Sequence, residues 1–193
     1  MGIMLSMPTS RKNYHHGDLR RALIAEGTEM LAESGPAGLS LREVARRLGV
    51  SHNAPYRHFA TRDALLAAIS AAGYDALAER TDGAAGDMTA RGLAYIAFAL
   101  EHRPVFRLMF SDLIDRAAFP ELAAAANSGL ERASRAIGAA YGDEPEAIMA
   151  AWSFVHGLAL LLLDGQAPGS LRRGRSDLAF AKDTLAAMAA ALA

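Results

Sequence analysis

Apolar residues recur along the chain at intervals of three and four, and no segment alternates with a period of two. This spacing gathers apolar side chains on one face of a helix, so the pattern predicts an all-α protein. The head of the chain is expected to hold helices over about 18–34, 41–48, 51–58 and 62–80. The rest is expected to hold helices over about 89–102, 104–110, 120–141, 148–163 and 177–192, about nine in all.

Capping and turn residues mark several of the expected helix ends. Ser40 followed by Glu43 has the form of a capping box, which predicts that the second helix begins at residue 41. Gly49 suits the left-handed position that follows a helix. Ser51 and Thr61 are expected to cap the next two helices. Residues 81–86, with the sequence TDGAAG, form the clearest linker.

Charge divides the chain unevenly, although the net charge is only −1. Residues 1–70 hold nine Lys and Arg against six Asp and Glu, whereas residues 71–193 hold eleven against fifteen. A basic head on an acidic body is the asymmetry expected if only the head meets an anionic partner.

Residues 40–59 read SLREVARRLGVSHNAPYRHF, which is a helix, a glycine turn and a second helix. This is the helix-turn-helix plan, whose second helix enters the major groove of DNA. That role explains why residues 51–58 offer almost no apolar surface. Asn53 could read adenine through its amide group, and further donors for phosphates and bases lie beside it: His52, Tyr56, Arg57 and His58. The alternative is a polar surface helix with no partner.

The head closely resembles the tetracycline-repressor (TetR) family of bacterial regulators. The resemblance lies in the segment LREVARRLGVS at 41–51 and in YRHF at 56–59, followed by RDALL at 62–66. It implies a three-helix DNA-binding head over 14–70 and a helical ligand-binding and dimerisation domain over 71–193, and residues 1–13 ahead of them are expected to form a flexible arm. Arg11 and Lys12 could add an arm contact in the minor groove, or belong to a disordered tail.

The resemblance also implies a set of DNA contacts. Arg42 would reach a base from the second helix, and Tyr56, His58 and Arg62 would hold phosphates. Ala54 and Pro55 replace a commoner polar and Leu or Tyr pair, so base preference does not transfer from relatives. The full expected set is Ser40, Arg42, Ser51, His52, Asn53, Ala54, Tyr56, Arg57, His58 and Arg62.

The sequence WSFVHG at 152–157 resembles the W-x-x-x-H-G signature of the WHG-type C-terminal domain of some TetR-like regulators. Such domains dimerise through their last two helices, here 148–163 and 177–192, and hold a small ligand. Aromatic and methionine walls with one or two polar groups would suit a small apolar molecule; the same side chains could equally be ordinary helical core. The residues expected at this pocket are Phe98, His102, Phe106, Met109, Phe110, Trp152 and His156.

No motif of catalysis or metal binding stands out. The chain has no cysteine, no phosphate-binding glycine loop and no H-E-x-x-H pair, so neither an enzyme nor a cofactor is expected. His15, His16 and Asp18 lack further ligands at metal-binding spacing. The N-terminus does not read as a secretory signal, and the most apolar stretch, from 148 to 163, reads as too short and too interrupted to span a bilayer. A cytoplasmic protein is expected.

These features together predict a ligand-responsive repressor that binds a palindromic operator as a homodimer. A ligand-dependent activator is the first alternative. A helical dimer that binds a small molecule without specific DNA binding is the second, although it would have no need of the polar 51–58 segment.

Overall fold

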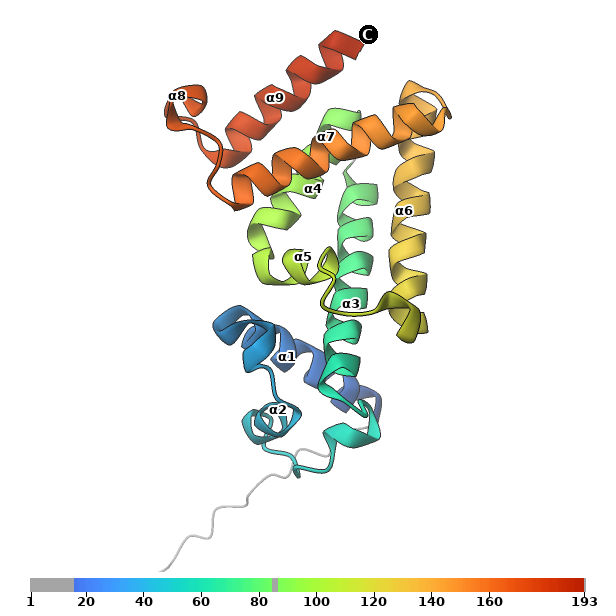
Figure 1. Cartoon of the computed structure of the whole chain (residues 1–193), viewed down its shortest axis with the longest axis vertical. Coiled ribbons are helices and arrows are strands. Elements are labelled where there is room, and N and C mark those ends of the chain that lie inside the picture. The colour runs from blue at the N-terminus through green and yellow to red at the C-terminus, as the bar shows by residue number, and fades with distance from the viewer. Residues whose placement is uncertain (1–15, 85–86, 193) are drawn as a thin grey trace, which may run out of the picture.

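The computed structural model describes residues 16–84 and 87–192, and within those ranges it is entirely helical (Figure 1). The all-α prediction is therefore confirmed for the described residues. The arm predicted over 1–13 lies outside them. The elements are α1 (His16–Gly38), α2 (Leu41–Arg47), η1 (Pro55–Arg57), α3 (Arg62–Gly83), α4 (Met88–Glu101), α5 (Arg103–Met109), η2 (Arg116–Ala118), α6 (Pro120–Tyr141), α7 (Pro145–Leu163), α8 (Gly169–Arg172) and α9 (Asp177–Leu192), where η marks a 3-10 helix.

The helices form a small head and a larger body joined by α3. Figure 1 shows α1, α2 and the start of α3 at one end, with α4 to α9 at the other. Helix α3 runs from the head into the body, where α6 lies alongside it. The predicted domain boundary between residues 70 and 71 falls inside this continuous helix.

Several helix boundaries follow from local signals in the sequence. Gly35 adopts a φ of 68° inside α1, so the regular helix is broken where Gly35 and Pro36 predicted its end. Gly49 has a φ of 68° after α2. The Thr61 hydroxyl accepts a hydrogen bond from the Ala64 N–H at 3.1 Å and so caps α3 as predicted.

Two segments expected to be irregular contain helix instead. Helix α3 continues to Gly83, so the linker predicted over 81–86 begins three residues late; residues 85 and 86 lie outside the described ranges. The short helix α8 lies in the stretch expected to be a loop between α7 and α9. The last two long helices are therefore α7 and α9, with α8 between them.

Helix α7 is longer than the sequence pattern indicated, because it begins at Pro145 and spans 19 residues. By length and composition alone it could cross a membrane, so the prediction that this stretch is too short was wrong. The core helices of soluble proteins can meet the same criterion of length and apolar composition. The large exposed apolar side chains of α7 are Met149 and Leu161.

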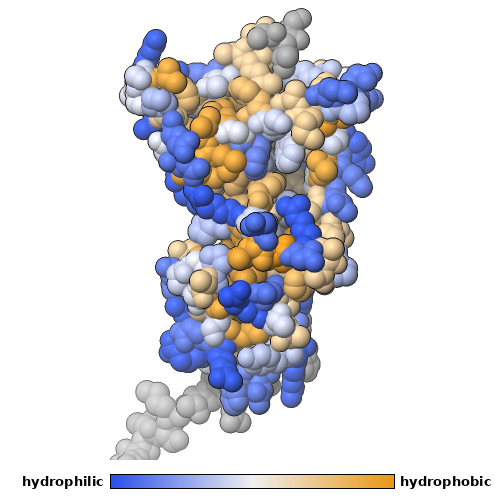
Figure 2. Space-filling model, in the orientation of Figure 1, coloured by the Kyte–Doolittle hydropathy of each residue, from blue (hydrophilic) through white to orange (hydrophobic). Residues whose placement is uncertain are grey.

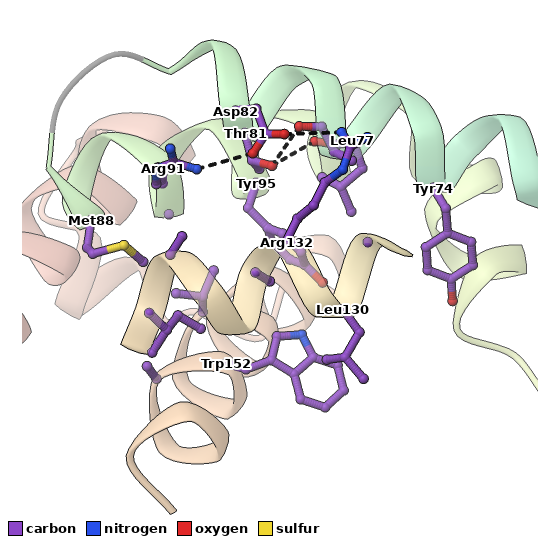
Figure 3. A pocket seen from close by; sticks show the side chains of 18 of the residues that line it. Tyr74, Leu77, Thr81, Asp82, Met88, Arg91, Tyr95, Leu130, Arg132 and Trp152 are labelled. Carbon is purple, nitrogen blue, oxygen red and sulfur yellow. Dashed lines mark hydrogen bonds and ion pairs between the residues drawn. The ribbon is translucent and has the colours of Figure 1, made fainter. Parts of the chain in front are cut away.

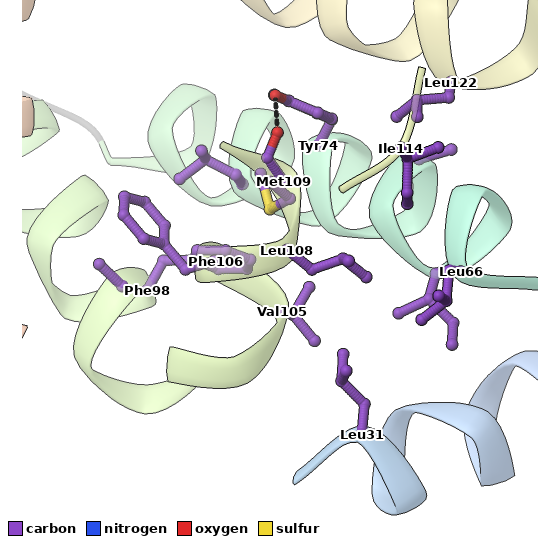
Figure 4. Packing of buried hydrophobic residues seen from close by; sticks show 14 of the residues in the cluster. Leu31, Leu66, Tyr74, Phe98, Val105, Phe106, Leu108, Met109, Ile114 and Leu122 are labelled. Atoms are coloured by element: carbon purple, nitrogen blue, oxygen red, sulfur yellow. Dashed lines mark hydrogen bonds between the residues drawn. The ribbon is translucent and has the colours of Figure 1, made fainter. Parts of the chain in front are cut away.

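One hydrophobic core joins the head to the body. Figure 4 shows Leu31 of α1 and Leu66 of α3 close to the side chains of α5, among them Val105 and Leu108. On the surface, the Arg20 guanidinium on α1 lies 2.5 Å from the Glu121 carboxylate on α6. The same guanidinium lies over the Phe59 ring, 5.5 Å from its centroid. The head is thus tied to the first turn of α6.

Replacing Gly73 by alanine should destabilise the protein by about 1–3 kcal/mol, because helices α3 and α5 approach each other there. An added Cβ would lie 2.7 Å from Met109 Sδ and 2.7 Å from Val105 Cγ1. Valine is stiff about χ1 and cannot easily turn away. Gly83→Ala is the matched control, since a Cβ there meets nothing within 4 Å. Urea unfolding should separate the two variants; equal stabilities would contradict this packing.

Candidate DNA interface and ligand cavity

Helix α2 presents its polar face outward because its apolar residues are buried against the head. Leu41, Val44 and Ala45 are buried, whereas Ser40 and Arg42 are exposed. The Ser40 side chain makes no cap hydrogen bond, so the predicted capping box was wrong. The side chain of Glu43, the other residue of the expected capping box, is bonded to two arginines instead.

Glu43 is engaged by the two arginines that follow it on α2. Arg46 donates to its carboxylate from Nε at 2.7 Å and from Nη2 at 2.5 Å. These bonds lower the pKa of Glu43 to about 2. Arg47 is held by carboxylates on α1 as well, with Nη2 of Arg47 lying 2.6 Å from Glu33 Oε2. Both guanidinium groups are therefore already paired within the head.

The segment 51–58 is not the continuous helix that the sequence predicted. Its N–H groups bond three residues back, from Ala54 to Ser51 at 2.9 Å and from Arg57 to Ala54 at 3.3 Å, and only Pro55–Arg57 forms a 3-10 turn. Pro55 has no N–H to donate, which removes the bond that an α-helix would need in the middle of this short segment. Pro55 and Phe59 are buried and anchor the segment to the head.

Most of the predicted DNA contacts share one exposed surface, formed by the start of α2, the 51–58 segment and the start of α3. This end of the molecule is strongly hydrophilic (Figure 2). Ala54 and His58 are half-buried, and His58 Nε2 is buried without a hydrogen-bond partner among the described residues. The exposed members are Ser40, Arg42, Ser51, His52, Asn53, Tyr56, Arg57 and Arg62.

The arginines of this surface differ in whether they are already paired. Arg62 lies 3.0 Å from the carboxylate of Asp63. Arg42 and Arg57 have no carboxylate partner within the part of the chain that the structure describes. An exposed guanidinium without an internal partner keeps all of its donors for an incoming phosphate or base edge. Arg42 and Arg57 are therefore the most available cations of the head.

A cavity of about 260 Å³ lies in the body between α3, α4, α6, α7 and α9 (Figure 3). Its walls are mostly apolar and aromatic, with two groups of polar residues among them. Arg116 of η2 is bonded to Tyr74, and Asp82, Arg91 and Arg132 form a charged cluster between α3, α4 and α6. The volume is just below the usual range for ligand sites, roughly 300–1,000 Å³, and suits a small molecule.

Two of the seven residues predicted at the pocket, Phe110 and Trp152, line this cavity. Phe98, Phe106 and Met109 are buried in the core instead, and His102 is exposed at the end of α4. His156 is not among the lining residues, but it lies against three of them, Tyr95, Phe110 and Trp152. The predicted set missed the lining from α3 and α6. Small residues at helical spacing on α6, Ala126, Gly129, Ala133 and Ala136, could have indicated a hollow face.

His156 is bonded to the cavity wall through Tyr95. The Tyr95 hydroxyl lies 2.8 Å from His156 Nδ1, and the Trp152 ring centroid lies 5.6 Å from that of His156. Burial raises the pKa of Tyr95, which keeps the phenol protonated, and burial lowers the pKa of His156.

This network predicts a loss of stability in mild acid. Because burial lowers the pKa of His156 from 6.5, the unfolded chain takes up this proton before the folded one. The His156 contribution to the unfolding free energy is therefore complete above pH 6.5 and falls as the pH drops further. The carboxylates with lowered pKa values, Glu33, Glu43 and Glu101, affect stability only at more acidic pH. Urea unfolding at neutral and mildly acidic pH should show a smaller pH dependence for His156→Gln than for wild type.

Comparisons with known proteins point in one direction. The model of the bacterial regulatory proteins of the tetR family matches residues 23–69. The model of the tetracyclin repressor-like C-terminal domain matches residues 88–188. The chain is similar to the HTH-type transcriptional repressor Rv3405c of Mycobacterium tuberculosis, with 38% identity over 63 residues, which is 33% of this chain and 31% of that protein.

Other relatives extend the similarity. The HTH-type transcriptional regulator Rv1816 of M. tuberculosis is 40% identical over 68 residues, 35% of this chain and 29% of that protein. The chain thus spans about a third of the length of these curated relatives. A Rhodococcus sp. RHA1 protein of unknown function is similar over 95% of this chain and 100% of its own, with 30% identity and a TM-score of 0.77. A transcriptional regulator from the same organism is similar over 89% and 96%, with 26% identity and a TM-score of 0.65.

Proposed function

Because the chain belongs to the tetR family of bacterial regulatory proteins, we propose that it is a ligand-responsive transcriptional repressor that binds a palindromic operator as a homodimer. Membership of this family makes it a regulatory protein rather than an enzyme. The sequence-based identification of the family is confirmed.

The observation that carries the DNA-binding role is the pair of unpaired, exposed guanidinium groups of Arg42 and Arg57 within the described head. They flank the exposed His52, Asn53 and Tyr56, whose donors suit bases and phosphates. Pro55 and Phe59 hold the backbone of this segment against the head. We assign base reading to Arg42 and Asn53, and phosphate contacts to Tyr56, Arg57 and Arg62.

The exposed apolar faces of α7 and α9 support the homodimer. Met149 and Leu161 on α7 are 54% and 46% exposed, and Leu178 on α9 is 40% exposed. Large apolar side chains collected on neighbouring helices mark an interaction surface. A second copy that presents the same two helices would bury them by two-fold symmetry. Contact with a second copy would also account for the apolar composition of α7 without a membrane.

The cavity supports a response to a small molecule. Helix α6 forms one wall of the cavity, and the first turn of the same helix carries Glu121, which is bonded to Arg20 of the head. Arg20 in turn lies over Phe59, directly after the 51–58 segment. A ligand that favours a different position of α6 would act on the head through this contact. Its effect on operator affinity is limited by its differential affinity for the two states, typically ~1–3 kcal/mol.

Selection of binding sites from random DNA tests this function. The proposal expects an enriched palindrome whose half-sites lie about 10–10.5 base pairs apart, the spacing of successive major grooves. Asn53→Ala and Arg42→Ala should change which bases are enriched. Failure to enrich any sequence would contradict the operator-binding role. An unchanged preference in both variants would contradict the assignment of the reading residues.

A further inference from the structure

Two arginines bond to a single carboxylate on one side of the cavity, and a third arginine lies near them. Arg91 Nη1 lies 3.3 Å from Asp82 Oδ1, and Arg132 Nη1 lies 3.1 Å from Asp82 Oδ2. Arg135 lines the adjoining hollow with these residues and has no carboxylate partner in the described ranges. Asp82 neutralises one of the three positive charges, so this side of the cavity carries a positive excess.

The guanidinium groups of Arg91 and Arg132 keep N–H donors that do not bond to Asp82. Arg91 and Arg132 each reach Asp82 through one nitrogen, Nη1. A guanidinium carries five N–H donors and binds a carboxylate best with two of them in parallel. The Arg91 and Arg132 side chains are 30% and 42% exposed, so a solute can approach them. Asp82 thus occupies only part of the anion-binding capacity.

The rest of the cavity is apolar. The apolar and aromatic residues of its walls include Leu77, Tyr95, Ile137, Trp152 and Leu185 of α9. The α6 residues that line it run from Ala126 to Tyr141, a length of roughly 22 Å at about 1.5 Å per residue. A mostly apolar cavity with cations on one of its sides fits a small molecule with an apolar body and one anionic group.

We propose that the cavity binds a small amphipathic carboxylate, with its apolar body between α3, α6 and α7 and its carboxylate on Arg91 and Arg132. This refines the expectation of a purely apolar ligand, and it rests on the proposed function only for its effect on DNA. Arg116, which lies beside Tyr74, is the less suitable anchor. Its Nη2 already donates to Tyr74 Oη at 2.8 Å and to the Met109 carbonyl at 2.7 Å.

The alternative is that Asp82 and the two arginines simply join α3, α4 and α6. One carboxylate between two arginines would suffice to join the three helices. That interpretation does not account for Arg135 or for the net positive charge of the cluster. The two interpretations predict opposite effects for Asp82. As an internal competitor for the arginines, Asp82 lowers the affinity for an anion; as a structural link alone, it has no such effect.

Trp152, the single tryptophan of the chain, lines the cavity and reports on its occupancy. The full-length protein would be titrated with decanoate, decanol and decylamine, which share one apolar chain and differ in head-group charge. Tryptophan fluorescence would give the three dissociation constants. Decanoate should bind about tenfold or more tightly than decanol, and decylamine should bind most weakly.

Variants separate the arginines from general packing. Arg91→Gln combined with Arg132→Gln should remove the preference for decanoate and leave decanol affinity unchanged. Asp82→Asn should strengthen decanoate binding several-fold. Arg107→Gln is the matched control, because Arg107 is paired with Asp164 outside the cavity and loses the same charge. Thermal unfolding of each variant checks that the fold is retained.

The outcomes distinguish this inference from the proposed function. Equal binding of decanoate and decanol, or no binding of any probe, overturns the inference. A decanoate preference that survives the double arginine substitution overturns it as well. If decanoate binds as expected but leaves operator affinity unchanged at saturation, the anion site stands and the proposed ligand response fails.

Discussion

Replacing Arg57 by alanine is expected to weaken operator binding by about 3 kcal/mol per dimer, roughly a hundredfold. The homodimer loses two charge-assisted hydrogen bonds to phosphates, each of which contributes on the order of 1.5 kcal/mol. Arg57 is exposed and has no internal partner in the described head, so its loss leaves the fold intact. Binding should weaken alike on all sequences, because phosphates carry no base identity.

The salt dependence supplies an independent readout for the same variant. Losing two phosphate contacts should reduce the slope of log affinity against log salt by about 2. Arg46→Ala removes the same charge from the same head, but Arg46 is bonded to Glu43. That control should retain most of the affinity and the slope. If both variants lose affinity equally, general electrostatic attraction rather than a contact explains the role of Arg57.

Replacing Phe106 by alanine is expected to destabilise the protein by about 3–5 kcal/mol, the range for large aromatic truncations in a core. Phe106 is fully buried. Its ring centroid lies 4.9 Å from that of Phe110 and 5.6 Å from that of Tyr95, both of which line the cavity. The substitution should therefore also loosen the cavity wall, since the packing that supports both rings is removed.

Urea and thermal unfolding measure this effect. For a chain of this size each kcal/mol lowers the melting temperature by roughly 2–4 °C, so a decrease of about 6–20 °C is expected. Leu171→Ala is the control, because Leu171 is 59% exposed on α8 and should change stability by less than about 0.5 kcal/mol. A small effect of Phe106→Ala would show that the core around α5 can collapse to fill the space.

Helix existence and many helix ends could be predicted from the sequence because they depend on local signals. Apolar residues three and four positions apart predict a helix from neighbouring positions alone. The Thr61 cap and the left-handed Gly49 likewise depend only on residues a few positions away. The predictions failed where a distant or competing contact decided the outcome. Ser40 and Glu43 have the spacing of a capping box, but Arg46 and Arg47 engage the carboxylate instead.

The DNA-facing surface could be predicted better than the cavity, for a physical reason. The residues of the head lie within one short stretch, so the exposed, polar positions can be identified from local pattern. The cavity is assembled from five helices, and its position depends on how α3 and α6 pack. Aromatic content indicated Phe110 and Trp152, but it also selected Phe98 and Phe106, which are equally aromatic and lie in the core.

Fluorescence anisotropy on the DNA upstream of its own gene, compared with scrambled DNA over a salt series, tests the central claim most directly. The account predicts tight binding that prefers the upstream DNA and weakens steeply with salt. Where that DNA lacks an operator, the palindrome selected from random DNA takes its place in the same titration. Equal and weak binding to the selected and scrambled DNAs would contradict the claim that the head of this protein reads an operator.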